Sequence, residues 1–204
     1  RLLEANGSGI FPWFSEGDPI LWWSPHPRMV LFPEELKVSR SLRKAVARGT
    51  FETRYDTAFA AVMRECAAPR GAQPGTWIVP EMVQAYTRLH ELGHAHSVES
   101  WKDGRLAGGL YGILLGRVFF GESMFARETD ASKVALVKLV ERAKGLGVRV
   151  IDCQQATPHL ASLGAREIPR REFAHLLAES IQYPPTGSRW PASEEAWRSS
   201  TTSP

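Results

Sequence analysis

The sequence predicts an α+β fold in which helices pack on one mixed sheet. Three apolar or alternating segments follow one another between residues 96 and 125, with turn residues between them, which is typical of an antiparallel meander. A helical pattern, a buried strand and a further helical pattern follow up to residue 181. With 43% hydrophobic content over 204 residues, the chain can bury a sizeable core, so disorder of the whole chain is excluded.

Residues 1–35 combine prolines with large aromatic side chains, as in Phe11-Pro12-Trp13-Phe14 and Trp22-Trp23. Prolines at this density exclude a long helix, whereas the aromatic rings supply anchors, so we expect short strands and ordered turns. The chain begins at Arg1 with neither a starting methionine nor an apolar leader. We therefore expect no secretion signal and an N-terminal segment that is shortened relative to the natural protein.

Residues 36–92 are expected to form a small domain around a short basic helix. Leu36–Val38 and Phe51–Tyr55 have the composition of strands, and Ser39 or Ser41 is a suitable N-cap for a helix that extends through Val46.

Two longer helices complete this small domain. Residues 56–66 are amphipathic, with Asp56 or Thr57 as the expected cap, and residues 69–75 are predicted to form a polar turn. Pro80 suits the first position of the next helix, and Gly93 suits its end.

Residues 93–183 are expected to form the larger domain, and residues 184–204, rich in Pro, Ser and Thr, a flexible tail. In the larger domain the predicted strands are His96–Trp101, Leu106–Leu115, Val118–Phe125, Val148–Cys153 and the extended piece Ala165–Ile168. The predicted helices run from Ala131 to Gly145 or Gly147, from Pro158 or His159 to Leu163, and from Arg171 to Ile181.

The positive charge of the chain is concentrated. The formal net charge is only +3, but residues 37–54 contain six cations and one anion. Four of these cations, Arg40, Arg43, Lys44 and Arg48, are spaced for one face of a helix. Two interpretations stay open: a solvated helix face, or a surface that attracts a polyanion.

The string His90-Glu91-Leu92-Gly93-His94 matches the zinc-protease pattern of two histidines one helical turn apart with a glutamate between them. That geometry requires a helix through His94, whereas Gly93 indicates a stop and a strand pattern begins by His96. A pair of histidines at a helix end is therefore favoured over a zinc site.

Three glycines, Gly108, Gly109 and Gly112, also have two interpretations. A phosphate-binding loop needs glycines before a helix N-terminus, but here apolar strand residues continue to Leu115. The favoured interpretation is that these glycines let neighbouring backbone segments approach closely inside the sheet.

Polar residues interrupt two buried strands. A buried Glu122 must be paired, so it forms either an ion pair with a nearby arginine or a site that captures a cation. Asp152 and Gln154 share one strand face by period-two alternation, which turns Cys153 away from them and argues against a Cys153 nucleophile. A strand end is a common place for a site, although a loop-capping Asp is the ordinary alternative.

Many ordered blocks carry a resemblance to one family over roughly residues 9–178. They are Gly9–Phe14, Trp22–Pro25, Pro27–Leu31, Ser39–Lys44, Gly75–Ile78, His90–Ser97, Gly121–Phe125, Ala131–Lys133, Ile151–Gln154, Ser162–Ala165 and Ile168–Arg171. Together these blocks resemble the leucyl/phenylalanyl-tRNA protein transferases.

The resemblance implies a bacterial cytoplasmic aminoacyltransferase. Such an enzyme moves leucine, or phenylalanine and in addition methionine, from aminoacyl-tRNA to the N-terminal Arg or Lys of acceptor proteins, and the product is an N-degron that directs degradation. The implied fold is a GNAT-like acyltransferase domain with a smaller N-terminal α/β domain. No cofactor and no metal are implied, and the histidine string becomes a family block without zinc.

The resemblance also implies residue roles. It assigns Asp152 and Gln154 to catalysis, Glu122 to the acceptor, Trp77 to the aminoacyl-adenosine end, and the cations Arg40, Arg43, Lys44 and Arg48 to the tRNA. We hypothesise that Asp152 orients Gln154 and the attacking amine and that Gln154 acts as acceptor and positioner, with the route of the proton left open. The donor side chain requires an apolar pocket, for which Leu110, Phe119, Leu136, Leu139 and Ile151 are candidates, although each also suits an ordinary core.

Two other functions are weighed against this one. An acyl-CoA-dependent N-acetyltransferase is disfavoured because residues 125–130 contain no glycine for a pyrophosphate loop. A noncatalytic tRNA-binding module is disfavoured because Asp152, Gln154 and Glu122 are all present. The two distant cysteines favour a reducing cytoplasm, and no apolar run reaches the roughly 18 residues that a membrane span needs.

Overall fold

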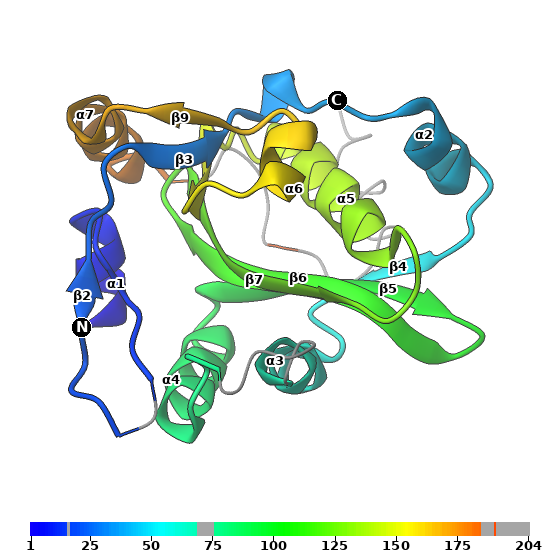
Figure 1. The fold of residues 1–204 in the computed structure, drawn as a ribbon, viewed down its shortest axis with the longest axis horizontal. Coiled ribbons are helices and arrows are strands. Elements are labelled where there is room, and N and C mark those ends of the chain that lie inside the picture. The colour runs from blue at the N-terminus through cyan, green and yellow to red at the C-terminus, as the bar shows by residue number, and fades with distance from the viewer. Residues whose placement is uncertain (16, 69–75, 185–189, 191–204) are drawn as a thin grey trace.

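A seven-stranded sheet forms the centre of the computed structural model, which describes residues 1–15, 17–68, 76–184 and 190 (Figure 1). The strand order within these residues is β4-β5-β6-β7-β8-β3-β9. The predicted turn at residues 69–75 and nearly all of the predicted tail lie outside the described residues. The strands are β3 (Arg28–Leu31), β4 (Glu52–Tyr55), β5 (Ala95–Lys102), β6 (Arg105–Leu115), β7 (Val118–Ala126), β8 (Val150–Gln154) and β9 (Arg166–Ile168).

The sheet is mixed, as predicted. Strands β4 to β7 are antiparallel neighbours, and β7 pairs in parallel with β8. The predicted strands from His96 to Phe125 are confirmed within one or two residues. Short strands were expected in residues 1–35, but not the place of β3 in the main sheet, where it lies between β8 and β9, antiparallel to both.

Helices cover both faces of the sheet. In Figure 1, α2 and α5 lie on one side and α3 and α4 on the other. One apolar cluster packs under α5, and a second lies between the sheet and α3, α4 and α7. Among the described residues, no helix has the length and apolarity to cross a membrane. The remaining elements are α1 (Leu2–Gly7), β1 (Phe11–Pro12), β2 (Trp22–Trp23), η1 (Pro33–Glu35), α2 (Arg40–Ala47), α3 (Phe59–Ala67), α4 (Pro80–Glu91), α5 (Ala131–Gly145), α6 (Pro158–Ser162) and α7 (Arg170–Ile181).

Local capping explains where α2 begins. The hydroxyl of Ser39 accepts the backbone N–H of Leu42 at 3.2 Å, so Ser39 is the N-cap, as predicted. The strand predicted for Leu36–Val38 is wrong. In that segment the backbone N–H of Lys37 donates to Leu163, but no strand ladder forms.

The predicted cap of α3 is also wrong, although the helix itself is confirmed. The carboxylate of Asp56 accepts the backbone N–H of Ser97 at 2.7 Å and bonds the ring of His96, which ties Asp56 to β5. The helix begins three residues after Asp56, at Phe59, and its N-cap is Ala58. The backbone N–H of the N-cap residue Ala58 donates to Glu99, a buried carboxylate of β5, at 2.8 Å.

The glycines of β6 permit close backbone packing, as predicted. A Cβ at Gly108 would lie 2.6 Å from the Cβ of Ala131, and one at Gly112 would lie 2.2 Å from the carbonyl oxygen of Phe120. These contacts show that the glycines serve packing between β6 and its neighbours.

The substitution Gly112→Ala is therefore expected to destabilise the fold by about 3 kcal/mol, because backbone cannot move aside as a flexible side chain can. Urea unfolding measures this effect. Gly121→Ala is the matched control, since a Cβ there meets nothing closer than 3.5 Å. Equal stability of the two variants would contradict the packing role.

Candidate active site

A cavity of about 380 Å³ lies where β7 and β8 diverge. The two strands pair only over Val118–Phe120 and Val150–Asp152. Beyond this pairing, residues of both strands line the cavity, together with residues of α5 and the α6 region. Four of the five predicted pocket residues form its apolar wall: Leu110, Leu136, Leu139 and Ile151.

The fifth predicted pocket residue, Phe119, does not line this cavity. Its side chain is fully buried and stacks against Trp190, with ring centroids 5.9 Å apart. Alternation along β7 places Phe119 in the core under α5, so it contributes packing there.

Two buried polar side chains, Glu122 and Gln154, also line the cavity. The Gln154 amide donates to Oε2 of Glu122 at 3.2 Å, and both side chains are buried. Oε1 of Glu122 has no hydrogen-bond partner among the described residues. Burial raises the pKa of Glu122 to about 7, while the neighbouring Tyr86 hydroxyl and the Gln154 amide oppose that rise. Within the described residues, Glu122 forms no ion pair with an arginine, so the first of its two interpretations is wrong.

Asp152 lies behind Gln154, away from the cavity. Its carboxylate forms a two-pronged ion pair with Arg28, with nitrogen to oxygen distances of 2.8 and 2.6 Å, and both side chains are fully buried. Arg28 also donates to the carbonyl oxygen of Gly9 at 3.2 Å, and it lies between the rings of Phe11 and Phe173. The partnership of Arg28 and Asp152 was not evident from the sequence.

The backbone connects Asp152 to the cavity. The N–H of Gln154 donates to Oδ1 of Asp152 at 3.0 Å, and Gln154 has a φ of +64°. Such a left-handed conformation is costly for a residue other than glycine and requires support from its surroundings. Asp152 supplies that support, so it sets where the Gln154 side chain points.

The predicted alternation fails at this point, because the left-handed residue ends the regular strand. Cys153 lines the cavity together with Gln154 instead of turning away from it. Burial and the nearby charge of Asp152 raise the pKa of the Cys153 thiol far above its usual value. The thiol stays protonated near neutral pH, which agrees with the expectation that it is no nucleophile.

A second, smaller cavity of about 190 Å³ adjoins the first. Trp77, predicted for the adenosine end, lines this cavity together with Trp13 of the N-terminal region. The two cavities share Cys153 and Gln154. The sequence indicated no role for Trp13, because only the fold brings it and Trp77 to the same cavity.

The four cations predicted to bind tRNA lie on α2 and at its C-terminal end, and all four are exposed. Within the described ranges, none of Arg40, Arg43, Lys44 or Arg48 forms an ion pair. The short basic helix is confirmed, and the contact of these cations with tRNA stays a prediction.

The histidine string ends a helix, as predicted. Helix α4 stops at Glu91, and Gly93 has a φ of +79°, so His94 is not on the helix. His90 bonds the carbonyl oxygen of Ala95 at 2.9 Å and stacks on Phe59. The described residues contain no group of three His, Cys, Asp or Glu side chains placed to hold a metal ion.

A mostly apolar cavity with a few convergent buried polar groups, between two diverging parallel strands, is typical of an enzyme active site. Comparison with known proteins identifies the family of enzymes. Residues 30–178 match the model of the leucyl/phenylalanyl-tRNA protein transferase family, and residues 1–26 match the model of the N-terminal domain of that family. The chain belongs to the leucyl/phenylalanyl-tRNA protein transferase family.

Curated relatives agree. The chain is 62% identical over 190 residues to a leucyl/phenylalanyl-tRNA–protein transferase of Nitrosospira multiformis and 60% identical to one of Chromobacterium violaceum. Each match covers 93% of this chain and 82% of the relative. Among solved structures, the C-terminal domain of a putative lysylphosphatidylglycerol synthetase from Agrobacterium fabrum aligns over 89% of this chain and 56% of that chain, with 13% identity. Its TM-score of 0.40 is too low to support a fold assignment.

Proposed function

We propose that this enzyme transfers leucine or phenylalanine, and in addition methionine, from aminoacyl-tRNA to an N-terminal Arg or Lys of an acceptor protein. The product carries a new peptide bond and an N-terminal residue that directs degradation. The observation that carries the proposal is a cavity lined both by apolar side chains and by the buried, hydrogen-bonded pair of Glu122 and Gln154. That arrangement suits an apolar aminoacyl side chain beside a reacting amine.

The two cavities accommodate the two parts of the donor. The aminoacyl side chain lies against Leu136, Leu139 and Ile151, and the terminal adenine stacks on Trp77 in the smaller cavity. The ester carbonyl then falls near Gln154, which lines both cavities. Holding the amine and the carbonyl together can supply several kcal/mol of the barrier.

The chemistry is aminolysis of an activated ester. The acceptor α-amino nitrogen attacks the carbonyl carbon, a C–N bond forms, and the ester C–O bond to the ribose breaks. An α-ammonium group has a pKa of about 8, close to the pKa of about 7 at Glu122. Proton transfer between these two groups is therefore nearly balanced. The carboxylate of Glu122, which lines the cavity, holds the incoming ammonium, accepts its proton, and returns a proton to the ribose oxygen that leaves.

Asp152 is a positioning residue in this proposal. The carboxylate of Asp152 is paired with Arg28 and does not line the cavity. Asp152 therefore orients Gln154 through the backbone N–H of Gln154 and does not touch the amine. This refines the hypothesis that Asp152 orients both Gln154 and the amine.

The exposed cations of α2 are proposed to contact the tRNA backbone. Replacing Arg40, Arg43, Lys44 and Arg48 together by glutamine is expected to weaken the binding of Leu-tRNA. The slope of log K against log salt concentration should fall in magnitude by about 3, because four phosphate contacts are lost. Filter binding over a salt series measures both quantities.

The control replaces Arg88 and Arg166, two exposed arginines that pair with Glu91 and Glu35. These substitutions should leave the salt slope unchanged. A slope that is the same in the α2 variant and the wild type would remove α2 from the tRNA interface.

The finer architectural predictions are proposals too. The divergence of the parallel strands β7 and β8 supports a GNAT-like catalytic domain with a smaller N-terminal α/β domain. The division into residues 1–35, 36–92, 93–183 and 184–204 stays a prediction, and β3 and β4, from the first two segments, pair into the same sheet as the strands of the third. The cytoplasm is the proposed location, because aminoacyl-tRNA is the donor.

A single assay tests the proposed function. The enzyme is incubated with radiolabelled Leu-tRNA and an Arg-initiated peptide, with acetyl-CoA as a donor in a parallel reaction. Label joined to the peptide N-terminus by an amide bond supports the proposal. Acetylation without leucine transfer would favour the acetyltransferase, and tRNA binding without either product would favour the noncatalytic module.

A further inference from the structure

One edge of β7 is only partly used. On one side, β7 pairs with β6 as far as Ala126. On the other side, it pairs with β8 only up to Phe120. Over residues 121–126, no strand of the described part of the chain occupies this second edge.

Backbone hydrogen bonds show which groups face the open edge. The N–H of Arg127 donates to Ala107 of the β6 side at 2.8 Å. Because backbone groups alternate between the two edges of an antiparallel strand, those of Met124 and Ala126 face the open edge. Ala126 is exposed and Met124 is half-buried, so both are accessible. An open edge of this kind is a template for another strand.

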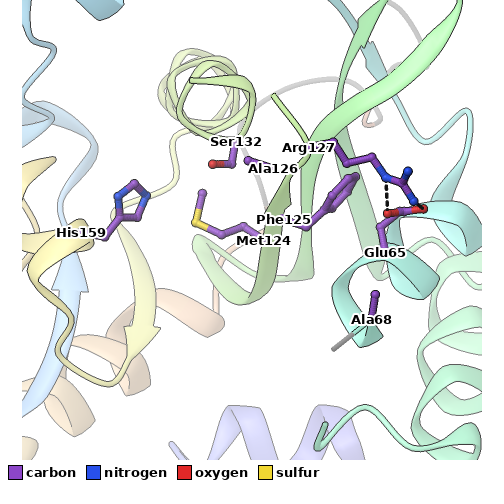
Figure 2. Close-up of a pocket in the computed structure, with 8 residues that line it drawn as sticks. All are labelled: Glu65, Ala68, Met124, Phe125, Ala126, Arg127, Ser132 and His159. Atoms are coloured by element: carbon purple, nitrogen blue, oxygen red, sulfur yellow. Dashed lines mark hydrogen bonds and ion pairs between the residues drawn. The ribbon is translucent and has the colours of Figure 1, made fainter. Parts of the chain in front are cut away.

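The open edge leads from the surface to the reaction cavity. A groove of about 450 Å³ runs along the end of β7 (Figure 2). Met124 and His159 line both this groove and the reaction cavity. At its outer end, Arg127 and Glu65 form a two-pronged ion pair with distances of 2.7 and 2.6 Å. The single arginine of the groove is thus neutralised, which gives a phosphate backbone little to bind.

We propose that the N-terminal segment of the acceptor polypeptide binds along this edge as an added β-strand, parallel to β7. This inference rests on the proposed function, which requires a free α-amine at Glu122 and Gln154. A polypeptide that starts there and continues past Met124 and Ala126 occupies the position beside β7 that β8 leaves at Gln154. The backbone then supplies binding without regard to sequence, which suits an enzyme that modifies many different acceptors.

A scan of N-methylated acceptor peptides tests the added strand in the wild-type enzyme. Single amides are methylated in turn at positions 2 to 6 of an Arg-initiated peptide. In a β-strand, every second amide faces β7, so KM for the acceptor should rise about three- to tenfold at alternate positions. KM for Leu-tRNA should not change. An equal response at all positions would overturn the added strand.

An enzyme variant provides a second measurement. Ala126→Pro removes an N–H that faces the open edge and breaks no bond to β6, so it should raise the acceptor KM about three- to tenfold. Thr53→Pro is the matched control, because by the same alternation its N–H faces the outer edge of β4, far along the sheet from β7. An unchanged acceptor KM in Ala126→Pro, or a raised KM for Leu-tRNA instead, contradicts the proposal. Leucine transfer to the unmethylated peptide by the wild type tests the proposed function separately.

Discussion

Replacing Glu122 with glutamine is expected to slow leucine transfer by at least about a hundredfold, because general acid–base groups contribute factors of that order or more. Glutamine has nearly the same shape, and its carbonyl oxygen can still accept the Gln154 amide, as Oε2 of Glu122 does at 3.2 Å. The side chain can no longer neutralise the incoming ammonium or accept its proton. Single-turnover kinetics with preloaded Leu-tRNA measures the loss in the chemical step.

The pH dependence of the same variant gives a second result. In the wild type, the transfer rate should rise as pH passes through about 7, where Glu122 ionises. In Glu122→Gln, the residual rate should lose that inflection. A variant that keeps the wild-type rate and pH profile would exclude Glu122 from the reaction.

Whereas Glu122→Gln should slow leucine transfer, it should increase the free energy of unfolding at neutral pH. The pKa of Glu122 is raised in the folded state from an ordinary 4.5 to about 7, so the unfolded chain releases the proton first as pH rises. The wild type therefore loses stability between pH 4.5 and pH 7, by about 3 kcal/mol for a shift of this size. The glutamine variant does not titrate. Its urea stability relative to the wild type should grow between pH 5 and pH 8, which separates lost chemistry from lost folding.

Replacing Arg28 with methionine is expected to destabilise the protein by about 3 to 5 kcal/mol, because the charge of the buried Asp152 carboxylate is then no longer balanced by a cation. Both side chains of this pair are at most 1% exposed. Methionine preserves much of the arginine volume against Phe11 and Phe173, so the cost comes mainly from the unpaired charge. Urea unfolding at pH 7 measures it.

The double variant Arg28→Met, Asp152→Asn tests that reasoning, because it removes both charges at once. It should recover part of the lost stability, since a buried pair can often be replaced with neutral residues at little cost. The single variant Asp152→Asn should lower kcat while KM for Leu-tRNA stays unchanged, as expected of a residue that acts through Gln154. If the double variant lost more unfolding free energy than the two single variants lose together, the pairing would be contradicted.

The sheet and its helices could be largely predicted from local signals. The meander is marked by Asp103-Gly104 and Gly116, three residues that all adopt positive φ at the turns. Ser39 marks the start of α2 by its hydroxyl, and Pro80 marks the start of α4. These features depend on neighbours in the sequence, so the sequence pattern suffices to find them.

What could not be predicted depends on distant partners. Strand β3 is four residues long and follows a proline-rich stretch, and only pairing with β8 and β9 makes it a central strand. Arg28 and Asp152 are 124 residues apart in the sequence. The left-handed Gln154 breaks the alternation that was used to place Cys153. Helix α1, at Leu2–Gly7, is too short to show a period.

The central claim is that the opening between β7 and β8 holds the aminoacyl group with its carbonyl at Gln154. A crystal structure with a non-hydrolysable leucyl-adenosine analogue, in which an amide replaces the ester, tests this most directly. The predicted result is a leucyl side chain in contact with Leu136, Leu139 and Ile151, with the adenine on Trp77 and the carbonyl beside Gln154. A leucyl group outside the larger cavity, or an adenine that occupies the larger cavity, would contradict this arrangement.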